Sequence, residues 1–461
     1  MEQTSVSTGK PQDPNEPPIE TTSELARWIA VGEKPKEKWR LGTEHEKFVY
    51  CRTTLKPVAY DGETGIRSIL MGLSERTGWP LIVENGNPIG LKGPAASVSL
   101  EPGGQFELSG APLENVHQTC TEAAEHLALV KDVAGPNGVA FFGMGFAPTW
   151  TRAEMPQMPK PRYDIMRRYM PKVGNLGLDM MHRTCTVQVN LDFASEADMA
   201  KKFRVSLAAQ PIATALFANS NLVEGKPSGW ASWRGRIWMD TDPDRTGLLD
   251  FVFEDGFGYE RYVDYMLDVP MYFLRRDGRY VDAAGQSFRA FLKGELPAAP
   301  GDRARLSDWE DHLSTAFPEV RLKRFLEMRG ADAGPWSRIC ALPAFWVGLL
   351  YEQASLDAAW DVVKDWSADE RRALRENAAR EGFRAKIRGR TVKDVALELI
   401  EISRQGLKAR ARRNWQNQDE TIFLEPLAEI AEAGLTLGEI NAKRFHALQG
   451  DLGKLLAESS Y

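Results

Sequence analysis

Residues 42–48 read Gly-Thr-Glu-His-Glu-Lys-Phe and place Glu44 and Glu46 two positions apart in a strand-like, apolar stretch. Side chains two apart on a β-strand lie on the same face of a sheet, so we expect both carboxylates on one face. His45 alternates out of phase with them, and we expect it on the opposite face in a structural role. This stretch therefore predicts a sheet with an acidic face.

Two further segments combine acids with a strand-like, apolar context. Residues 99–107 carry Glu101 and Glu107, and residues 325–329 carry Glu327 and, on the same strand face, Arg329. A sheet face that bears several carboxylates is unfavourable unless cations neutralise it. Mg²⁺ prefers oxygen ligands and usually binds together with substrate phosphates. The five glutamates therefore predict a magnesium site and point to ATP chemistry.

The composition is that of a globular protein and narrows the class of partner. Of the 461 residues, 43% are hydrophobic and 26% are charged, and the formal net charge is −6. This balance does not favour nucleic-acid binding, and no apolar run approaches the roughly 18 residues of a membrane span. We therefore expect small-molecule substrates, no nucleic acid, no membrane, and a monomer or weak homodimer.

Residues 1–20 are polar and proline-rich, and we expect them to form a mobile arm. They contain acids and no arginine, which argues against a transit peptide. From residue 21 to residue 461 there is no composition break, long linker or internal repeat. One α+β domain, with a mostly helical part from about residue 342, is the simplest architecture.

The clearest alternating strand covers residues 184–193. Its apolar side chains, at positions 187, 189 and 191, face one way, and the polar side chains of Thr186, Gln188, Asn190 and Asp192 face the other. An entirely polar face on a central-looking strand suggests a ligand cavity, with an ordinary surface strand as the alternative.

The rest of the chain divides by texture. Residues 79–91 predict a strand, an Asn-Gly turn and a second strand, within a region from 21 to about 118 that mixes strands and turns. Helical spacing predicts helices over 119–134 and 195–219, and 139–146 reads as a buried strand. Residues 147–182 are rich in proline, arginine and methionine and predict irregular structure around an active site.

No phosphate-binding loop or dinucleotide fingerprint is present in the sequence. ATP would therefore be held by Mg²⁺ and by arginines, whose guanidinium groups pair well with phosphate oxygens. The candidates are Arg234, Arg236, Arg245 and Arg329. A surface ion pair is the alternative role for each, and Arg329 stands out because it shares a strand face with Glu327.

Other catalytic schemes fit less well. The four cysteines lack CxxC spacing, which argues against a zinc site. The simplest interpretation is that all four are reduced thiols. No GxSxG elbow is present, and Cys185 has no evident base beside it. A paired-carboxylate hydrolase is possible, although five acids are more than acid–base catalysis needs.

Four long segments closely resemble glutamate–cysteine ligases of the plant and proteobacterial type. They are residues 99–120, 169–193, 210–219 and 318–349, and the similarity extends from about residue 20 to the C-terminus. The resemblance implies a fold related to glutamine synthetase, in which a curved antiparallel sheet forms a funnel flanked by helices. It also implies one ligase catalytic domain over residues 21–461.

The implied reaction is the first step of glutathione synthesis. ATP phosphorylates the γ-carboxylate of L-glutamate, and the amine of L-cysteine attacks the γ-glutamyl phosphate. The resemblance places Mg²⁺ ligands at Glu44, Glu46, Glu101, Glu107 and Glu327, and catalytic phosphate contacts at Arg234 and Arg329. Substrate contacts are implied at Met181, Arg183, Thr184, Thr186, Gln188 and Asn190. More distant bacterial ligases have a histidine near the position of Gln188.

The resemblance also bears on redox control and location. Plant relatives contain regulatory disulfides, and Cys120 and Cys340 match one such pair. A second plant pair falls where this chain has Ala283 and Ala298. Plant relatives carry a chloroplast transit peptide, and the lack of a comparable segment favours a bacterial cytoplasmic enzyme.

Several alternatives stay open on sequence alone. The same chemistry could supply γ-glutamylcysteine for ergothioneine synthesis, or could use another acceptor amine. A non-catalytic glutamate or nucleotide sensor on the same scaffold and a metal-dependent hydrolase are the other classes. A sensor would be favoured by loss of a metal acid, yet all five are present, and a hydrolase would not consume ATP.

Overall fold

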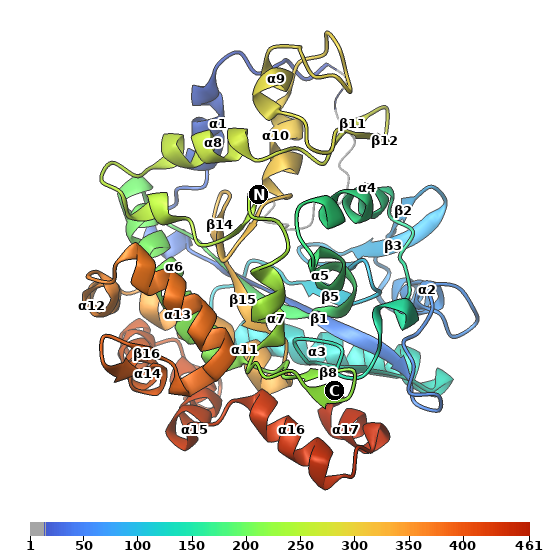
Figure 1. The fold of residues 1–461 in the computed structure, drawn as a ribbon, viewed down its shortest axis with the longest axis vertical. Helices are drawn as coiled ribbons and strands as arrows, with labels where there is room; N and C mark the ends of the chain where they lie inside the picture. Colours follow the sequence, from blue (N-terminus) through green and yellow to red (C-terminus); the bar gives the residue numbers. More distant parts are fainter. Residues whose placement is uncertain (1–12, 14) are drawn as a thin grey trace.

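The computed structural model describes residue 13 and residues 15–461, and a nine-stranded sheet forms its centre (Figure 1). The strand order is β14-β15-β7-β1-β5-β4-β3-β2, with β6 paired to the far end of β1, and every pair is antiparallel. The strands are β1 (Leu41–Cys51), β2 (Leu81–Glu84), β3 (Asn87–Lys92), β4 (Ser97–Leu100), β5 (Phe106–Ser109), β6 (Val139–Phe142), β7 (Thr186–Leu191), β14 (Val320–Leu322) and β15 (Leu326–Asp332).

Helices surround this sheet and dominate the C-terminal part, which confirms the predicted α+β class. They are α1 (Thr22–Ala30), α2 (Ile66–Thr77), α3 (Val116–Ala134), α4 (Pro161–Tyr169), α5 (Gly177–Arg183), α6 (Glu196–Phe217), α7 (Trp233–Trp238), α8 (Tyr259–Asp268), α9 (Phe288–Leu292), α10 (Leu306–Leu313), α11 (Trp336–Leu350), α12 (Gln353–Val363), α13 (Ala368–Glu381), α14 (Val392–Arg410), α15 (Glu425–Ala433), α16 (Leu437–Ala447) and α17 (Leu452–Ser459). Short strand pairs lie outside the main sheet: β8 (Leu222–Val223) with β9 (Lys226–Pro227), β10 (Thr246–Gly247) with β13 (Phe317–Pro318), β11 (Phe273–Arg276) with β12 (Arg279–Asp282), and β16 (Lys386–Ile387) with β17 (Arg390–Thr391).

The predicted alternation of β7 places its apolar side chains against helices. Val187, Val189 and Leu191 are buried in the largest hydrophobic cluster, where α11 packs against β7 and α6 packs against β15. Burying these branched side chains stabilises the sheet through the hydrophobic effect. The polar face of β7 is thereby turned to the other side of the sheet.

The predicted strand–turn–strand at residues 79–91 is confirmed by β2 and β3. Asn85 and Gly86 connect the strands with φ angles of 48° and 78°. Two successive residues with positive φ are typical of a type I′ turn, which Asn-Gly favours. This hairpin forms one edge of the nine-stranded sheet.

Two regions contain helices where the sequence predicted other structure. The region from 21 to about 118 includes α1 and α2, and residues 147–182 include α4 and most of α5. The prediction of irregular structure over 147–182 was therefore wrong in part. Pro161 lies in the first turn of α4, where the missing N–H costs nothing and the fixed φ favours the helix.

Most of the predicted mobile arm, residues 1–12 and 14, lies outside the described residues. The end of that segment is packed onto the protein. Ile19 is buried, its N–H donates to the carbonyl of Ala304, and Pro18 forms an isolated bridge with Arg305. Ordered packing therefore begins before residue 21.

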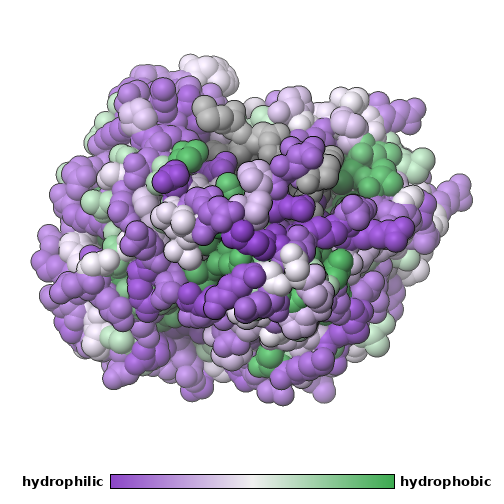
Figure 2. Space-filling model, turned by 90° about the horizontal axis from the view of Figure 1, so that it is seen from above, coloured by the Kyte–Doolittle hydropathy of each residue, from purple (hydrophilic) through white to green (hydrophobic). Residues whose placement is uncertain are grey.

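Within residue 13 and residues 15–461, no single helix has the length and apolar character needed to cross a membrane. The face of the molecule in Figure 2 is mostly hydrophilic, and its hydrophobic residues form small separate patches.

Candidate active site

A cavity of about 140 Å³ lies on the polar face of the sheet. Its lining includes four of the five predicted glutamates, Glu44, Glu46, Glu101 and Glu107, together with Arg234 and Arg329. The two glutamates from β1 share a face, as their spacing predicted. His45 has its ring on the other side of the strand, beside Lys47 and His126.

The register of the sheet brings these distant sequence segments together. Across β1 and β5, Glu46 pairs with Glu107, and across β1 and β7, Glu44 pairs with Gln188. Directly paired residues have side chains on the same face. Glu101 lies in the short turn between β4 and β5, so it joins the group from the end of the sheet.

The glutamates of β1 and β5 carry more negative charge than their surroundings neutralise. Burial, together with the neighbouring Glu327 and Glu107, raises the pKa of Glu44 to about 7. Burial and the charges of Glu101 and Glu107 raise the pKa of Glu46 well above its usual value, and burial also raises the pKa of Glu107. A divalent cation would relieve this repulsion, so the donor set fits Mg²⁺ chemically.

The carboxylates do not form a closed metal-binding cluster. In the part of the chain that the structure describes, no three Asp, Glu, His or Cys side chains are arranged so that they could hold a metal ion. Mg²⁺ usually keeps several waters and binds through one or two carboxylates plus substrate phosphates. An incomplete protein coordination sphere is therefore consistent with a metal that binds together with its nucleotide.

Glu327 differs from the other four glutamates. It is completely buried and does not line the cavity. Arg321 donates to both of its oxygens, at 2.5 and 2.9 Å, and Arg329 donates to Oε1 at 2.7 Å. Burial, which raises the pKa of Glu327, is outweighed by Arg321 and Arg329, and its pKa lies far below the usual range. Its charge is therefore already neutralised by protein groups.

The four candidate arginines separate into two pairs. Arg234 and Arg329 line the cavity, and the Arg234 guanidinium donates to the carbonyl oxygen of Arg329 at 3.0 Å. Arg236 instead pairs with Asp240, and Arg245 forms a completely buried ion pair with Asp242. The structure thus brings only the first pair to the acidic face, and the other two have structural roles.

The predicted substrate residues also divide. Met181, Thr184, Thr186 and Gln188 line the cavity. Asn190 lies beneath it and donates to Glu44 Oε1 at 2.8 Å. Arg183 lies outside the lining and forms ion pairs with Asp179 and Glu224.

Further contacts tie the polar face of β7 to the acids and arginines. The N–H of Thr186 donates to Glu46 Oε2 at 2.9 Å, and Arg329 donates to the side-chain oxygen of Gln188. The polar face of β7 therefore supports the acids and the arginine from below, as its alternation predicted.

Three lining residues on α4, namely Arg162, Tyr163 and Met166, were not predicted from sequence. Arg162 and Tyr163 line the cavity, and the Tyr163 hydroxyl lies 3.3 Å from Glu101 Oε1. Their segment was assigned to active-site structure only through its richness in basic residues and proline. A basic residue beside an aromatic one within that segment was the available signal.

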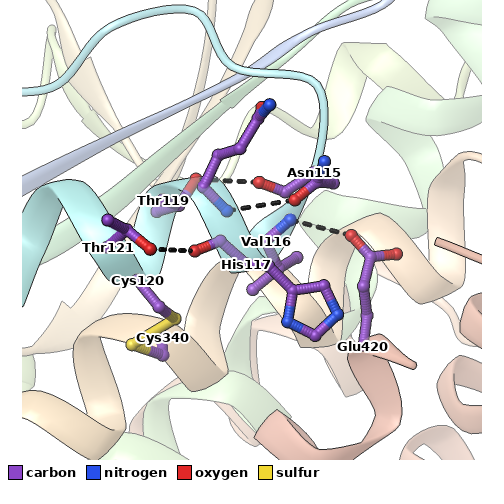
Figure 3. Close-up of a disulfide and its surroundings, with 9 residues drawn as sticks. Asn115, Val116, His117, Thr119, Cys120, Thr121, Cys340 and Glu420 are labelled. Carbon is purple, nitrogen blue, oxygen red and sulfur yellow. Dashed lines mark hydrogen bonds between the residues drawn. A yellow bond between two sulfur atoms is a disulfide. The ribbon is translucent and has the colours of Figure 1, made fainter. Parts of the chain in front are cut away.

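Behind the sheet, Cys120 and Cys340 form a disulfide, with their Cα atoms 5.5 Å apart (Figure 3). The bond joins α3 to α11. Close to it, Asn115 caps the start of α3, and the N–H of Val116 donates to Glu420 Oε1 at 2.8 Å. Cys51 and Cys185 are free thiols.

Comparison with known proteins gives strong matches. A model of the Glutamate-cysteine ligase family 2 matches residues 40–458. The chain is 56% identical over 419 residues to glutamate–cysteine ligase B, chloroplastic, of Oryza sativa subsp. japonica, with 91% of this chain and 83% of that protein covered. It is 54% identical over 430 residues to glutamate–cysteine ligase, chloroplastic, of Nicotiana tabacum, covering 93% and 81%. Its identity to the chloroplastic enzyme of Arabidopsis thaliana is 55% over 419 residues, covering 91% and 78%.

A solved structure shares the fold at much lower identity. It is the glutamate–cysteine ligase of Francisella tularensis in complex with AMP, with a TM-score of 0.56 and 13% identity over 93% of this chain and 88% of that chain. This likeness supports the fold alone.

The expected bacterial cytoplasmic location is contradicted by these matches. The similar plant enzymes are named chloroplastic. The expectation depended on the residues before position 21, most of which lie outside the described residues.

Proposed function

This chain belongs to the glutamate–cysteine ligase family, and on that premise we propose how its residues divide the work of the reaction. The protein is an ATP-dependent ligase that forms γ-glutamylcysteine, the first step of glutathione biosynthesis. The observation that carries the assignment of residues is the buried acidic face, on which Arg234 and Arg329 meet four carboxylates.

The proposed metal ligands are the four glutamates that line the cavity, Glu44, Glu46, Glu101 and Glu107. Their mutual repulsion and burial support this role, because a bound cation would remove both penalties. When bound, Mg²⁺ contacts phosphate oxygens and neutralises charge during phosphoryl transfer. Glu327 was predicted as a fifth ligand. Since both of its oxygens bind arginines, we assign it instead to positioning Arg329.

The arginines supply the fixed positive charge in this proposal. Arg234 and Arg329 would donate to the γ-phosphoryl group of ATP and then to the acyl phosphate, where planar guanidinium groups suit phosphate oxygens. An oxygen of the glutamate γ-carboxylate attacks the γ-phosphorus, and ADP leaves. The cysteine amine then attacks the acyl carbon, phosphate leaves with its electron pair, and the amine loses a proton.

The polar face of β7 and the end of α5 would orient the two amino acids. Met181, Thr184, Thr186 and Gln188 offer a thioether, two hydroxyls and an amide to the cavity. Their hydrogen bonds to glutamate or cysteine would hold the reacting groups close together, which lowers the entropic part of the barrier. Asn190 supports the site indirectly, through Glu44.

We also propose which part of the chain forms the functional unit. Residues 21–461 would act as one catalytic domain, because the C-terminal helices α11 and α14 pack on each other and α11 packs on β7 of the central sheet. We propose that it works as a monomer or weak homodimer. Light scattering after size-exclusion chromatography tests the mass directly, and a stable higher oligomer would contradict it.

The deciding experiment measures ADP released by the purified full chain with ATP and L-glutamate. Four conditions combine the presence or absence of L-cysteine with Mg²⁺ or EDTA, and γ-glutamylcysteine is detected by mass. We expect cysteine-stimulated ADP release with a matching amount of dipeptide, and loss of both in EDTA. ADP release without that dipeptide would point to another acceptor amine. The absence of any ADP release would contradict the proposal and favour a sensor.

A further inference from the structure

Asp332 is a buried carboxylate at the end of β15 that has no role in the reaction as described so far. It is 1% exposed, lies outside the cavity lining, and pairs with Thr186 across β15 and β7. The backbone packs closely against it, because a Cβ atom at Gly145 would lie 2.3 Å from Asp332 Cγ. Burying a charge is unfavourable unless it is hydrogen-bonded, so the partners of Asp332 indicate its role.

Three donors surround the carboxylate of Asp332. Its Oδ2 accepts from the N–H of Asn219 at 2.8 Å and from the hydroxyl of Ser220 at 2.6 Å. Its Oδ1 accepts from the hydroxyl of Ser232 at 2.9 Å. An ionised carboxylate can only accept hydrogen bonds, so it matches a site in which every neighbour donates.

The two hydroxyl groups connect this carboxylate to the start of α7. Ser220 Oγ accepts from the N–H of Arg234 at 3.1 Å, and Ser232 Oγ accepts from the N–H of Gly235 at 3.0 Å and caps the helix. A hydroxyl has a single proton. Because both hydroxyls accept from α7, each directs its proton to Asp332, and the carboxylate fixes the orientation of both.

This arrangement holds Arg234 at its backbone, while the cavity holds its side chain. Arg234 is 3% exposed, lines the cavity, and donates from its guanidinium to the carbonyl oxygen of Arg329. Its charge also interacts with Asp332, since burial raises the pKa of Asp332 and the positive charge of Arg234 counteracts this. Asp332 is therefore linked to Arg234 through both hydrogen bonds and charge.

We propose that Asp332 is a positioning residue, which fixes the start of α7 through Ser220 and Ser232 and thereby holds Arg234 where it donates to the phosphoryl group. This inference rests on the phosphate role proposed above for Arg234. Asp332 acts only through that arginine and contacts no substrate. A shift of about 1 Å in a group that positions the reactants can cost about 10²-fold in rate.

The test combines Asp332→Asn with Arg234→Lys in the full chain. Asparagine keeps the shape but turns an NH₂ group toward one of the three donors. We expect Asp332→Asn to lower kcat for γ-glutamylcysteine formation about ten-fold or more, with KM for L-cysteine changed by less than about three-fold, because Arg234 acts on phosphate. In the Arg234→Lys background, it should lower kcat by less than about three-fold, since residues that act as a unit are not additive.

Two further variants separate positioning from stability. Ser220→Ala removes the atom that joins Asp332 to the N–H of Arg234, so it should lower kcat in the same way, and it decides the question if Asp332→Asn does not fold by circular dichroism. Glu420→Gln is the control. Glu420 is also a buried carboxylate, bound by Arg410 and by a backbone N–H near the disulfide, and its variant should keep kcat within about two-fold.

The outcomes distinguish this inference from the proposed function. If Arg234→Lys keeps the kcat of the wild type, the phosphate role of Arg234 is wrong and the inference is overturned with it. If Arg234→Lys is impaired but the folded variants of Asp332 and Ser220 keep full kcat, only the inference is overturned. An equal fold loss from Asp332→Asn in both backgrounds would also overturn it, because a general structural defect does not depend on Arg234.

Discussion

Arg329 contacts the residues of the acidic face and is also the proposed donor to phosphate. Its guanidinium donates to Glu327 at 2.7 Å and to the side chain of Gln188 while lining the cavity. A lysine ammonium cannot reach these partners and a phosphate oxygen in the same planar arrangement. We expect Arg329→Lys to lower kcat about 10²–10³-fold, the usual effect of removing one donor to a developing charge.

Arg236 supplies the matched control for that substitution. It lies two residues after Arg234 on the same helix, but pairs with Asp240 outside the cavity lining. Arg236→Lys should leave kcat within about two-fold of wild type, since exposed ion pairs contribute little. Steady-state ADP release measures both variants. Equal losses in the two would contradict the assignment of Arg329 to the reacting groups.

Glu327 lies in a buried ion-pair network, so replacing it tests how much this network contributes to the stability of the protein. Its carboxylate is 0% exposed and is bound by Arg321 and Arg329. Removing one member of a buried ion pair leaves the other charge uncompensated, which costs about 3–5 kcal/mol. We expect Glu327→Ala to lower the free energy of unfolding in urea by that amount. Glu114→Ala, which loses a more exposed pair with Arg40, should change it by less than about 1 kcal/mol. Similar values would refute the buried network.

Residue spacing predicted part of this site correctly. The two-residue period placed Glu44 and Glu46 together and turned His45 away, as the structure has them. The partners of Glu327 could not be predicted in the same way. Arg321 faces it from β14 in a cross-strand pair. The residue pattern within one strand does not show which residue of another strand it pairs with.

Helices α3 and α11 are linked by the Cys120–Cys340 disulfide, which spans 220 residues of sequence. Cross-linking over a long loop restricts the unfolded chain, and native disulfides typically contribute about 2–5 kcal/mol. We expect the double variant Cys120→Ser/Cys340→Ser to lose stability by this order, and dithiothreitol to lower the Tm of the wild type.

The free thiol Cys51 provides the control for the disulfide. Cys51→Ser should keep the Tm of the wild type and its sensitivity to dithiothreitol, because that residue is not bonded. If reduction left the Tm of the wild type unchanged, the link between α3 and α11 would carry no stability in solution.

Helix α3 also carries a carboxyl group whose environment makes stability depend on pH. Burial raises the pKa of Glu122 from its usual value of 4.5 to about 7. The folded state therefore binds more protons than the unfolded state between these values. The resulting stability is full below about pH 4.5 and is lost as pH rises through about 7.

Glu122→Gln tests this sign, because glutamine is uncharged at every pH. At pH 8 we expect the variant to be about 1–3 kcal/mol more stable than wild type, and near pH 5 the difference should shrink toward zero. Urea unfolding at the two pH values measures it. A difference that is constant across pH, or that grows on acidification, would contradict the raised pKa.

Among the helices and strands, the sequence predicted correctly those segments whose conformation is set by their own residues. Asn85 and Gly86 specify their turn by backbone conformation alone, and the hairpin was predicted correctly. Helix α4 was not predicted. Its segment was read as irregular because it is rich in proline, arginine and methionine, whereas Pro161 occupies the first helical turn. The Tyr163 hydroxyl donates to the carbonyl of Leu100, so contacts outside the helix contribute to its stability.

For the whole molecule, the strand order explains why one face collects the acids. The central strands β15, β7, β1 and β5 lie side by side although they come from residues 326, 186, 41 and 106 onward. Composition and periodicity predicted an α+β domain with an acidic sheet face, but no local pattern fixes this order. The funnel-like fold came from the resemblance of long segments, whose length made it specific.

The most direct test of the proposed reaction follows an oxygen atom of the glutamate γ-carboxylate. The protein is given Mg²⁺-ATP, L-cysteine and L-glutamate labelled with oxygen-18 in the γ-carboxylate, in unlabelled water. If that carboxylate is phosphorylated in the cavity and displaced by the cysteine amine, one labelled oxygen must appear in each phosphate released, in step with γ-glutamylcysteine. Dipeptide formed together with unlabelled phosphate would contradict the γ-glutamyl phosphate route and the roles proposed for Arg234 and Arg329.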